Sequence, residues 1–228
     1  MVEASGWDKI ASMDVVNLPL LKYAARKGRP LVISTGMATL VEIERAVSVV
    51  RAQGNDRIIL LHCVSIYPPE YDSINLRNIP MLEGEFGVPV GFSDHTLGTA
   101  IPLAAIGLGA CVIEKHFTLD QDMEGWDHAV SATPEQLRTI VEEGLNVFRS
   151  RGTLDRVVSK AEFEKRKKFR RSLVARRSLP AGHVLAEPDL VAKRPGTGIA
   201  PDELEHVLGR KLARAVTEDQ VIRREDLA

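Results

Sequence analysis

Short runs of apolar, β-branched residues alternate with helical stretches along the first 150 residues of the chain. Between the runs, apolar residues recur at the spacing of a helix face, in one segment at Leu40, Ile43, Val47 and Val50 and in another at Leu137, Ile140, Val141 and Phe148. The runs predict five strands, at Asp8–Ser12, Leu31–Ser34, Arg57–Cys63, Val88–Asp94 and Cys111–Phe117. Such alternation is typical of a parallel sheet covered by helices.

Two of the helical stretches carry clear start signals. Thr39 and Glu42 have the spacing of a capping box, in which each side chain satisfies a free backbone N–H of the first turn. Thr133 and Gln136 repeat this spacing, and Pro134 follows at the first helical position, where its missing N–H costs nothing. We therefore expect helices to begin directly after Thr39 and Thr133.

The spacing of the strands favours a barrel over other parallel folds. Five strand–helix units fill roughly residues 8–150 at about 28 residues each, close to the period of an eightfold barrel of about 250 residues. Five units cannot close such a barrel, and eight would need about 80 more residues. No Gly-rich dinucleotide turn follows the first strand, which disfavours a Rossmann fold. The sequence thus predicts a partial (β/α)8 TIM barrel, with an open five-stranded sheet as the alternative.

The composition changes after residue 150. Residues 151–171 are rich in charge and lack a strand pattern, which indicates an exposed helix or linker. Their basic cluster could contact nucleic acid, but we interpret it as a solvated face; it comprises Lys165, Arg166, Lys167, Lys168, Arg170 and Arg171. Residues 172–228 show short alternating runs broken by Pro and Gly, which predicts a small β-rich domain near the lower size limit for independent folding.

The overall composition excludes several classes of protein. With 30 Lys and Arg against 31 Asp and Glu, the net charge of −1 argues against a nucleic-acid or membrane-surface protein. No apolar run approaches the roughly 20 residues that a bilayer span requires, and the N-terminus lacks a signal pattern. Cys63 and Cys111 form no CxxC, so neither a disulfide framework nor a zinc knuckle is indicated. We expect a soluble cytoplasmic protein.

Polar residues stand where the predicted strands end. Because functional side chains of a βα barrel cluster at the carboxyl ends of its strands, we expect these residues to meet at one mouth. A lysine with several hydroxyl groups is a plausible cradle for phosphate or carboxylate. Each serine alone could equally be tied to nearby backbone. The residues concerned are Lys9, Ser12, Ser34, Ser65, Tyr67 and Ser93.

Two histidines follow consecutive predicted strands. A parallel sheet would place His95 and His116 side by side, where neutral imidazoles can hold a divalent metal and leave positions open for water or substrate. A hydrogen-bonded structural role is the alternative for each ring. Asp94 could orient one ring through its second nitrogen. His62, His128, His183 and His206 show no partner pattern, and we interpret them as structural or exposed.

Several motifs together resemble the sialic acid synthase (N-acetylneuraminate synthase) family. They are KIASMDVVNLPLL, LVISTGM, LLHCVSIYP, PVGFSDHTLG, GACVIEKHFTLD and GWDH, followed by RRSLVA and KRPGTGI. The match runs through nearly the whole chain in the family's own order. The C-terminal module, residues 172–228, resembles the antifreeze-like (SAF) domain of that family.

The resemblance implies a condensation of phosphoenolpyruvate with an N-acyl amino sugar, typically N-acetylmannosamine, that yields a nine-carbon 2-keto acid and phosphate. It implies a divalent metal, usually Mn²⁺ with Mg²⁺ or Co²⁺ as alternatives, held by His95 and His116. It implies a domain-swapped homodimer in which Arg194 enters the partner's site. Phosphoenolpyruvate-binding positions match Lys9, Ser12, Ser34 and Ser93, and Tyr67 and Asp127 match positions near the sugar or the metal-bound water.

The sequence departs from the family pattern in four respects. Motifs from the family's first three strands are missing, including a glutamate and a lysine–glutamine pair, and we expect this to affect whether the chain catalyses alone. Asp14, Ser65 and Trp126 replace a glutamate, an asparagine and a proline, and the last two positions bear on substrate choice. Alternatives are a sibling synthase for legionaminic acid, pseudaminic acid or spore-coat polysaccharide, and a non-catalytic remnant that binds carbohydrate or a subunit.

Overall fold

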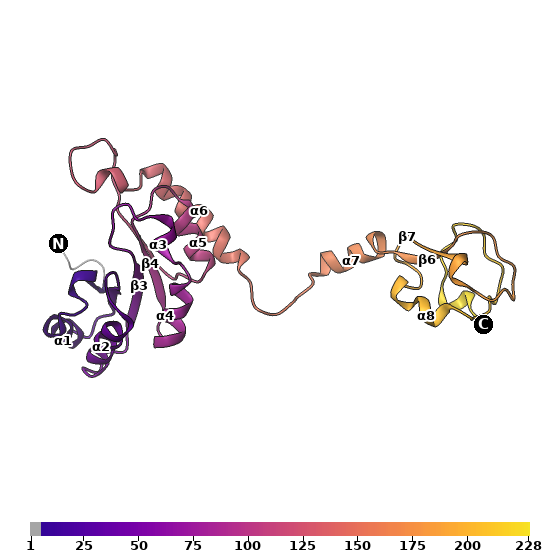
Figure 1. Ribbon diagram of the computed structural model, residues 1–228, viewed down its shortest axis with the longest axis horizontal. Helices are drawn as coiled ribbons and strands as arrows, with labels where there is room; N and C mark the ends of the chain where they lie inside the picture. Colours follow the sequence, from indigo (N-terminus) through magenta and orange to yellow (C-terminus); the bar gives the residue numbers. More distant parts are fainter. Residues whose placement is uncertain (1–5) are drawn as a thin grey trace. The chain divides into compact units, whose positions relative to one another are not determined.

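The computed structural model describes residues 6–228, which divide into two compact units (Figure 1). The first unit reaches to Gly152, and the second runs from Thr153 to Ala228. Residues 1–5, the start of the predicted barrel domain, lie outside the described residues.

The first unit contains a five-stranded parallel sheet with its strands in sequential order. The strands are β1 (Asp8–Ile10), β2 (Leu31–Ser34), β3 (Ile58–Cys63), β4 (Val90–Asp94) and β5 (Ile113–Lys115). Every neighbouring pair is parallel and in register, from Lys9 beside Val32 to Asp94 beside Lys115. The partial-barrel prediction is confirmed, although most strands are shorter than the apolar runs that predicted them.

Helices connect the strands in the expected alternation (Figure 1). They are α1 (Leu18–Arg26), α2 (Leu40–Arg51), α3 (Tyr71–Ile74), α4 (Asn78–Phe86), α5 (Ala100–Gly107) and α6 (Pro134–Ser150). Both predicted capping boxes form, with Thr39 and Thr133 as the N-caps. None of the helices within residues 6–228 is long and apolar enough to cross a lipid bilayer.

Strand alternation gives the two faces of the sheet different characters. Every second strand residue packs against the helices in one hydrophobic core, as Ile33, Leu60 and Phe92 do. The intervening residues face the opposite side, where polar groups such as Lys9 and Ser34 contact each other. We call this opposite side the inner face. The hydrophobic effect thus fixes which strand residues reach the solvent-facing hollow of the half-barrel.

The predicted apolar face of α6 is largely exposed. Ile140 is buried, but Leu137, Val141 and Phe148 are exposed. The reason is local: α6 packs mainly on α5, where a Cβ added to Gly144 would lie 2.8 Å from the Ile106 side chain. Because β5 is the last strand of the described sheet, the rest of the α6 face extends past it.

The second unit is a small β-rich domain preceded by helix α7 (Lys160–Phe169). Strands β6 (Ser172–Ala175) and β7 (Leu190–Lys193) pair antiparallel, and a short helix α8 (Leu204–Val207) follows. An isolated bridge between Val174 and Val221 ties a further segment to β6, and another joins Leu179 to Val216. Its core is built from fully buried residues of many segments, among them Leu185, Leu212 and Ile222.

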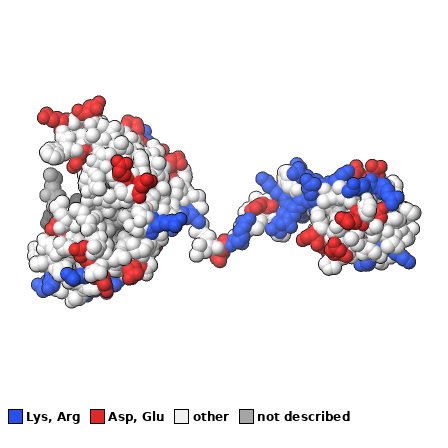
Figure 2. All heavy atoms as spheres, viewed as in Figure 1, with Lys and Arg blue, Asp and Glu red and all other residues white. Residues whose placement is uncertain are grey.

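Basic side chains gather over α7 and the segment after it (Figure 2). The Gly196 backbone N–H donates to the Lys167 carbonyl at 2.9 Å, and a Cβ on Gly196 would lie 2.8 Å from the Arg166 carbonyl oxygen. The loop after β7 therefore packs directly against the end of α7. Arg166 lies over the Phe163 ring at 4.4 Å, and Lys167 pairs with Glu164 at 3.0 Å.

A buried carboxylate stabilises the second unit. The Asp189 side chain is 3% exposed, and its oxygens accept hydrogen bonds from Arg177 and His183, each at 2.7 Å. The Ala186 backbone N–H adds a third donor at 3.1 Å. The His183 bond is the main cause of a lowered pKa, which brings the pKa of Asp189 to about 2. The ionised carboxylate therefore belongs to the folded state.

We predict that replacing Asp189 by Asn flattens the acid sensitivity of the second unit. A carboxyl pKa of about 2 in the folded state, against 3.8 in the unfolded state, contributes about 2 kcal/mol above pH 4 that disappears as the pH falls toward 2. Urea titrations of the full chain, followed by NMR resonances of residues 172–228 at several pH values, measure this. Asp202→Asn, at an exposed carboxylate, is the control; equal pH slopes for Asp189→Asn and the unmodified chain would contradict the prediction.

Candidate functional site

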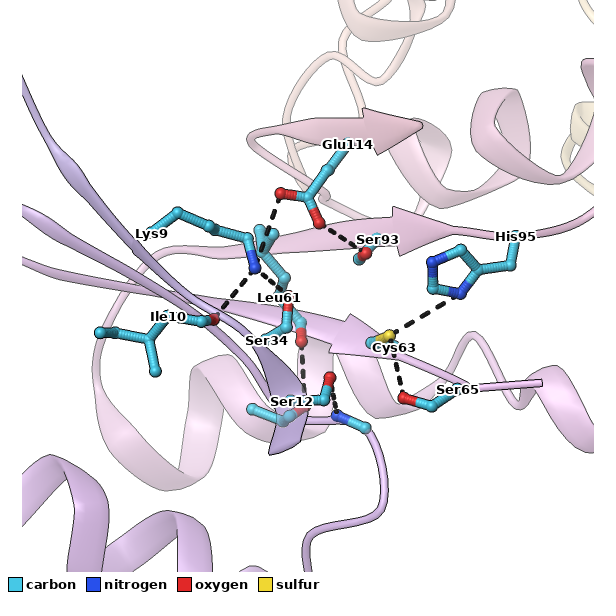
Figure 3. Close-up of polar contacts among 12 residues, drawn as sticks. Lys9, Ile10, Ser12, Ser34, Leu61, Cys63, Ser65, Ser93, His95 and Glu114 are labelled. Carbon is cyan, nitrogen blue, oxygen red and sulfur yellow. Dashed lines mark hydrogen bonds and ion pairs between the residues drawn. The ribbon is translucent and has the colours of Figure 1, made fainter. Parts of the chain in front are cut away.

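The carboxyl ends of the strands surround a cavity of about 400 Å³ on the inner face. Side chains from all five strands or the residues directly after them line it. They include Lys9, Ser34, Cys63, Ser93, His95 and Glu114, most of them visible in Figure 3. The polar residues predicted at the strand ends of the first unit therefore meet at one mouth.

A chain of polar contacts crosses this mouth from β1 to β5 (Figure 3). The Lys9 ammonium donates to the Ser34 hydroxyl at 2.7 Å and lies 3.6 Å from the Glu114 carboxylate. The Ser93 hydroxyl donates to the other Glu114 oxygen at 2.7 Å. The Lys9 ammonium, which comes from β1, is thus held on the inner face between Ser34 of β2 and Glu114 of β5.

Glu114 was not predicted from the sequence, which pointed only to His116 at the end of this strand. The sequence did contain a signal, because Glu114 is a charged residue within the apolar run Cys111–Phe117. A carboxylate that is partly buried in a strand needs a polar partner. Its place in the register supplies that partner: Glu114 stands beside Ser93, and both side chains lie on the inner face. The structure adds Glu114 to the candidate residues.

Three side chains meet closely around Gly36, directly after β2. The Gly36 backbone N–H donates to the Ser12 hydroxyl at 3.1 Å. A Cβ at this position would lie 2.3 Å from the Ser65 hydroxyl, 2.8 Å from the Ser12 hydroxyl and 3.2 Å from the Cys63 sulfur. Only glycine leaves room for this approach. Ser12 itself opens a 3₁₀ turn, Ser12–Asp14, instead of ending a strand as predicted.

The two histidines lie side by side, as the strand order predicts. The His95 and His116 ring centroids are 5.3 Å apart. The Tyr67 ring packs against both, at 4.0 Å from His95 and 5.6 Å from His116. His95 Nδ1 lies 3.0 Å from the Val64 carbonyl oxygen. A carbonyl only accepts, so Nδ1 carries the proton in a neutral ring and Nε2 keeps a free lone pair.

Electrostatic coupling links His95 to the neighbouring thiol. Burial opposes protonation of the ring, but hydrogen bonds with Cys63 and the Val64 carbonyl outweigh it and raise the pKa of His95. Burial also acts to raise the pKa of the Cys63 thiol, yet contacts with His95 and Ser12 outweigh it and lower that pKa. Desolvation, with negative charge nearby, raises the pKa of Tyr67, so its hydroxyl keeps its proton at neutral pH.

The arrangement fits a divalent cation held by two imidazoles. His95 has a free Nε2, and a smaller cavity of about 130 Å³ is lined by Ser93, His95, Glu114, Lys115 and His116. Within residues 6–228, no group of three or more His, Cys, Asp or Glu side chains could hold a metal. A cation bound here would therefore take its other ligands from water or from a substrate, as open catalytic sites do.

Asp127 reaches the second histidine from a loop. Its carboxylate lies 3.8 Å from His116 Nδ1 and is largely exposed. The Ser131 hydroxyl donates to the Asp127 carbonyl at 2.6 Å, and Thr118 and His128 lie 2.8 Å apart at the base of the loop. These bonds fix the backbone that presents Asp127. His128 is thus structural, as is buried His62, whose Nε2 lies 2.6 Å from the Ile74 carbonyl.

Asp94 does not orient a histidine ring, contrary to the sequence-based expectation. One carboxylate oxygen accepts the Thr96 backbone N–H at 2.8 Å, and the other accepts from the Lys115 ammonium at 2.7 Å. The reason is alternation along β4: Ser93 faces the inner side, so the next residue points toward the helices. Asp94 therefore serves the packing behind the mouth.

Arg194 belongs to the second unit and is exposed there. Its guanidinium carbon lies 5.5 Å from the centroid of the Phe169 ring, within the range of a cation–π contact. The contact joins the loop after β7 to the end of α7. The remaining predicted site residues all lie in the first unit.

A larger hollow of about 570 Å³ lies elsewhere on the first unit, between α2, β3 and α4. Ser65 and Cys63 border it, together with Met37, Leu40 and Asn78. Lys9, Glu114 and both candidate metal ligands are not among its lining residues. The converging polar groups, and not the largest volume, mark the candidate site.

Comparison with known proteins connects both units to described families. Residues 5–156 match a model of the NeuB family, and residues 170–228 match a model of the SAF domain. The chain is 43% identical over 209 residues to an N,N'-diacetyllegionaminic acid synthase of Legionella pneumophila, covering 90% of this chain and 59% of that relative. It is 34% identical over 220 residues to the N-acetylneuraminate-9-phosphate synthase of Homo sapiens, covering 95% and 61%.

A solved structure agrees with these matches. The N-acetylneuraminic acid synthetase of Leptospira borgpetersenii, crystallised with citrate, superimposes with a TM-score of 0.67 at 38% identity, covering 71% of this chain and 56% of that one. The chain thus spans about three fifths of the length of the curated relatives described above.

We predict that Gly36→Ala destabilises the first unit, because the added methyl group must displace the Ser12 and Ser65 hydroxyls. Overpacking of this kind costs about 1–3 kcal/mol. Gly84→Ala is the matched control, since a Cβ there meets nothing within 4 Å inside helix α4 and should stabilise the helix by up to about 1 kcal/mol. Urea unfolding followed by tryptophan fluorescence compares the two variants. A Gly36→Ala variant as stable as Gly84→Ala would show that the three side chains are not held as described.

Proposed function

The chain belongs to the NeuB family, which includes sugar acid synthases, and we propose that it condenses phosphoenolpyruvate with an N-acyl amino sugar. The acceptor is N-acetylmannosamine or a related sugar in its aldehyde form. The products are a nine-carbon 2-keto sugar acid and phosphate. The observation that carries this proposal is the convergence of Lys9, Ser34, Ser93 and Glu114 opposite the paired rings of His95 and His116.

The Lys9 side of the mouth suits phosphoenolpyruvate. This substrate carries a carboxylate and a phosphate, which bind ammonium and hydroxyl donors through charge-assisted hydrogen bonds. Lys9 supplies the charge, while Ser12, Ser34 and Ser93 supply hydroxyls around it. The contact between Lys9 and Ser34 holds the ammonium ready before substrate arrives, which reduces the cost of ordering it on binding.

The histidine side of the mouth suits the sugar aldehyde. We propose that His95 and His116 hold a divalent cation, Mn²⁺ in the first instance with Mg²⁺ or Co²⁺ as alternatives. When bound, such a cation supplies Lewis-acid polarisation of the aldehyde oxygen. The Nδ1 proton shared with the Val64 carbonyl fixes His95 in the tautomer that this role requires.

The residues around the mouth suit the steps of the proposed reaction. The C3 carbon of phosphoenolpyruvate forms a bond with the aldehyde carbon, and positive charge develops at C2. Water adds at C2, and the C2–O bond to phosphate then breaks, leaving the keto group. Glu114, between Ser93 and Lys9, is positioned to take a proton from that water. Tyr67 keeps its proton and can donate to the developing sugar oxygen, and Asp127 orients His116 from the other side.

The named relatives are synthases of different sugar acids. Ser65 lines the mouth beside Tyr67, and Trp126 precedes Asp127 with its side chain exposed. Both positions differ from the family pattern described above. We propose that they select the acyl substituents of the acceptor.

We predict that His116→Ala abolishes Mn²⁺-dependent phosphate release. The test is a phosphate-release assay with phosphoenolpyruvate, Mn²⁺ and a panel of N-acyl hexosamines. Loss of one of two imidazole ligands should lower the rate by at least about 100-fold, in the range known for removal of groups around a catalytic metal. His206→Ala, at an exposed histidine of α8, is the control and should be unaffected.

Two outcomes of this assay would overturn the proposal. One is unchanged activity in His116→Ala, which would remove the two-histidine site. The other is no phosphate release by the unmodified chain with any acceptor, which would favour a non-catalytic carbohydrate- or subunit-binding role.

We also propose that the active form is a homodimer with exchanged C-terminal domains. The support is the resemblance of the KRPGTGI segment to a family motif and the exposure of Arg194 on the second unit, where Phe169 holds its guanidinium. A planar guanidinium can fix the amide oxygen of an N-acyl sugar. In the exchanged dimer, Arg194 of one subunit completes the site of the other.

We predict that Arg194→Ala raises the KM for the sugar at least about 10-fold while changing the KM for phosphoenolpyruvate little, since the guanidinium contacts only the acceptor. Mixing Arg194→Ala chains with His116→Ala chains should restore part of the activity, because a mixed dimer contains one complete site. Arg156→Ala, at an exposed arginine of the second unit, is the control. Equal effects on both substrates, or no recovery on mixing, would argue against the exchange.

A further inference from the structure

A buried ion pair lies directly behind the two histidines. The Lys115 ammonium is 2.7 Å from the Asp94 carboxylate, and the two side chains are 3% and 0% exposed. Lys115 also donates to the Thr96 carbonyl at 2.6 Å, while Asp94 accepts the Thr96 backbone N–H at 2.8 Å. Both backbone groups of Thr96 are therefore bound by one ion pair, on the helix side of the sheet.

The ion pair is tied to the histidines by sequence and by register. Asp94 ends β4 and immediately precedes His95, and Lys115 ends β5 and immediately precedes His116. The two charged residues stand opposite each other in the parallel register. Because alternate residues point to opposite sides, a bond between Asp94 and Lys115 on one side sets the separation of the next two residues on the other.

The loop at His95 has little freedom left. His95 lies between Asp94 and Thr96. The Asp94 carboxylate accepts a hydrogen bond from the Thr96 backbone N–H, and Lys115 of β5 donates to the Thr96 carbonyl. On the other strand, β5 pairs with β4 through only three residue pairs, and the Asp94–Lys115 pair is the last of them. Without the ion pair, the end of β5 that leads to His116 would lose the side-chain tie to β4 that lies nearest to it, and only the Ser93–Glu114 hydrogen bond one residue earlier would remain.

Stability alone does not account for a buried pair at this place. Replacing a buried ion pair by apolar residues is often neutral or stabilising, because the charges must be taken out of water. The pair is electrically neutral as a whole, so it adds no net charge beside the mouth. What it supplies is a fixed geometry between two strand ends.

We propose that Asp94 and Lys115 are positioning residues that hold the His95 and His116 rings at the separation needed to share one divalent cation. This inference rests on the proposed cation site and adds the interaction that sets the separation of its two histidine ligands. Lys115 borders the smaller cavity, but its ammonium is bound to Asp94 and to the Thr96 carbonyl, so both residues act through the positions of the two rings.

The sign of the effect separates positioning from simple charge. If only charge mattered, Lys115→Met would leave a negative carboxylate near the site and tighten Mn²⁺ binding, whereas Asp94→Asn would leave a positive ammonium and weaken it. The Asp94→Asn/Lys115→Met double variant would then bind like the unmodified chain. Positioning instead predicts weaker binding in all three variants, by about 10–100-fold, the range found for residues that support metal ligands.

Binding of Mn²⁺ alone to the full chain, measured from the EPR signal of free Mn²⁺, gives these affinities. The double variant guards against unfolding, since it leaves no uncompensated charge and Asn keeps the oxygen that accepts from Thr96. Asp226→Asn is the control, because it breaks the ion pair of a buried carboxylate with the half-exposed Arg214 in the second unit. It should lower stability without changing Mn²⁺ affinity.

A second measurement needs no metal. Imidazole ¹⁵N shifts report the tautomer of His95, which should be a single Nδ1–H form in the unmodified chain and a mixture in the double variant. A double variant with unchanged Mn²⁺ affinity and an unchanged tautomer would overturn the positioning role. If the unmodified chain and His116→Ala bind Mn²⁺ equally while the tautomer still changes, the cation site fails and the positioning of His95 stands.

Discussion

The parallel register of the five strands is the constraint on which this site depends. Each strand places one residue of every two against the helices, where Ile33, Leu60 and Phe92 form a continuous core. Burial of these residues also fixes the side to which the alternate residues point, because a shift of one residue in the strand register would put every apolar side chain on the wrong face. The polar ends of the strands are therefore brought to one edge, on one side, by the same force that folds the unit.

Two different polar layers result from this alternation. On the inner face, Lys9 and Glu114 join the outermost strands of the described sheet across the mouth. On the helix side, Asp94 and Lys115 join β4 to β5 just before the two histidines. The first layer is accessible and suited to binding anions, and the second is buried and suited to holding geometry. Ser93 and Glu114 of the accessible layer directly precede Asp94 and Lys115 of the buried layer along β4 and β5.

Much of this could be predicted from the sequence because the signals are local. The alternation of strands and helices and their spacing predicted the half-barrel. The order of the strands predicted that His95 and His116 lie side by side. Glu114 was missed because its partners, Lys9 and Ser93, are distant in sequence and appear only through the register. The wrong role for Asp94 has the same origin: its neighbour in sequence is His95, but its partner in space is Lys115. The exposed face of α6 likewise depends on what packs beside it, which a periodic pattern cannot specify.

Anomalous diffraction from crystals of the chain grown with Mn²⁺ tests the central claim most directly. The expected result is one anomalous peak within coordination distance of a ring nitrogen of both His95 and His116, with water completing the ligand shell and Lys9 on the facing side of the cavity. A peak bound to one ring only, a peak at another site in the first unit, or no peak at saturating Mn²⁺ would contradict a cation shared by the two strand ends.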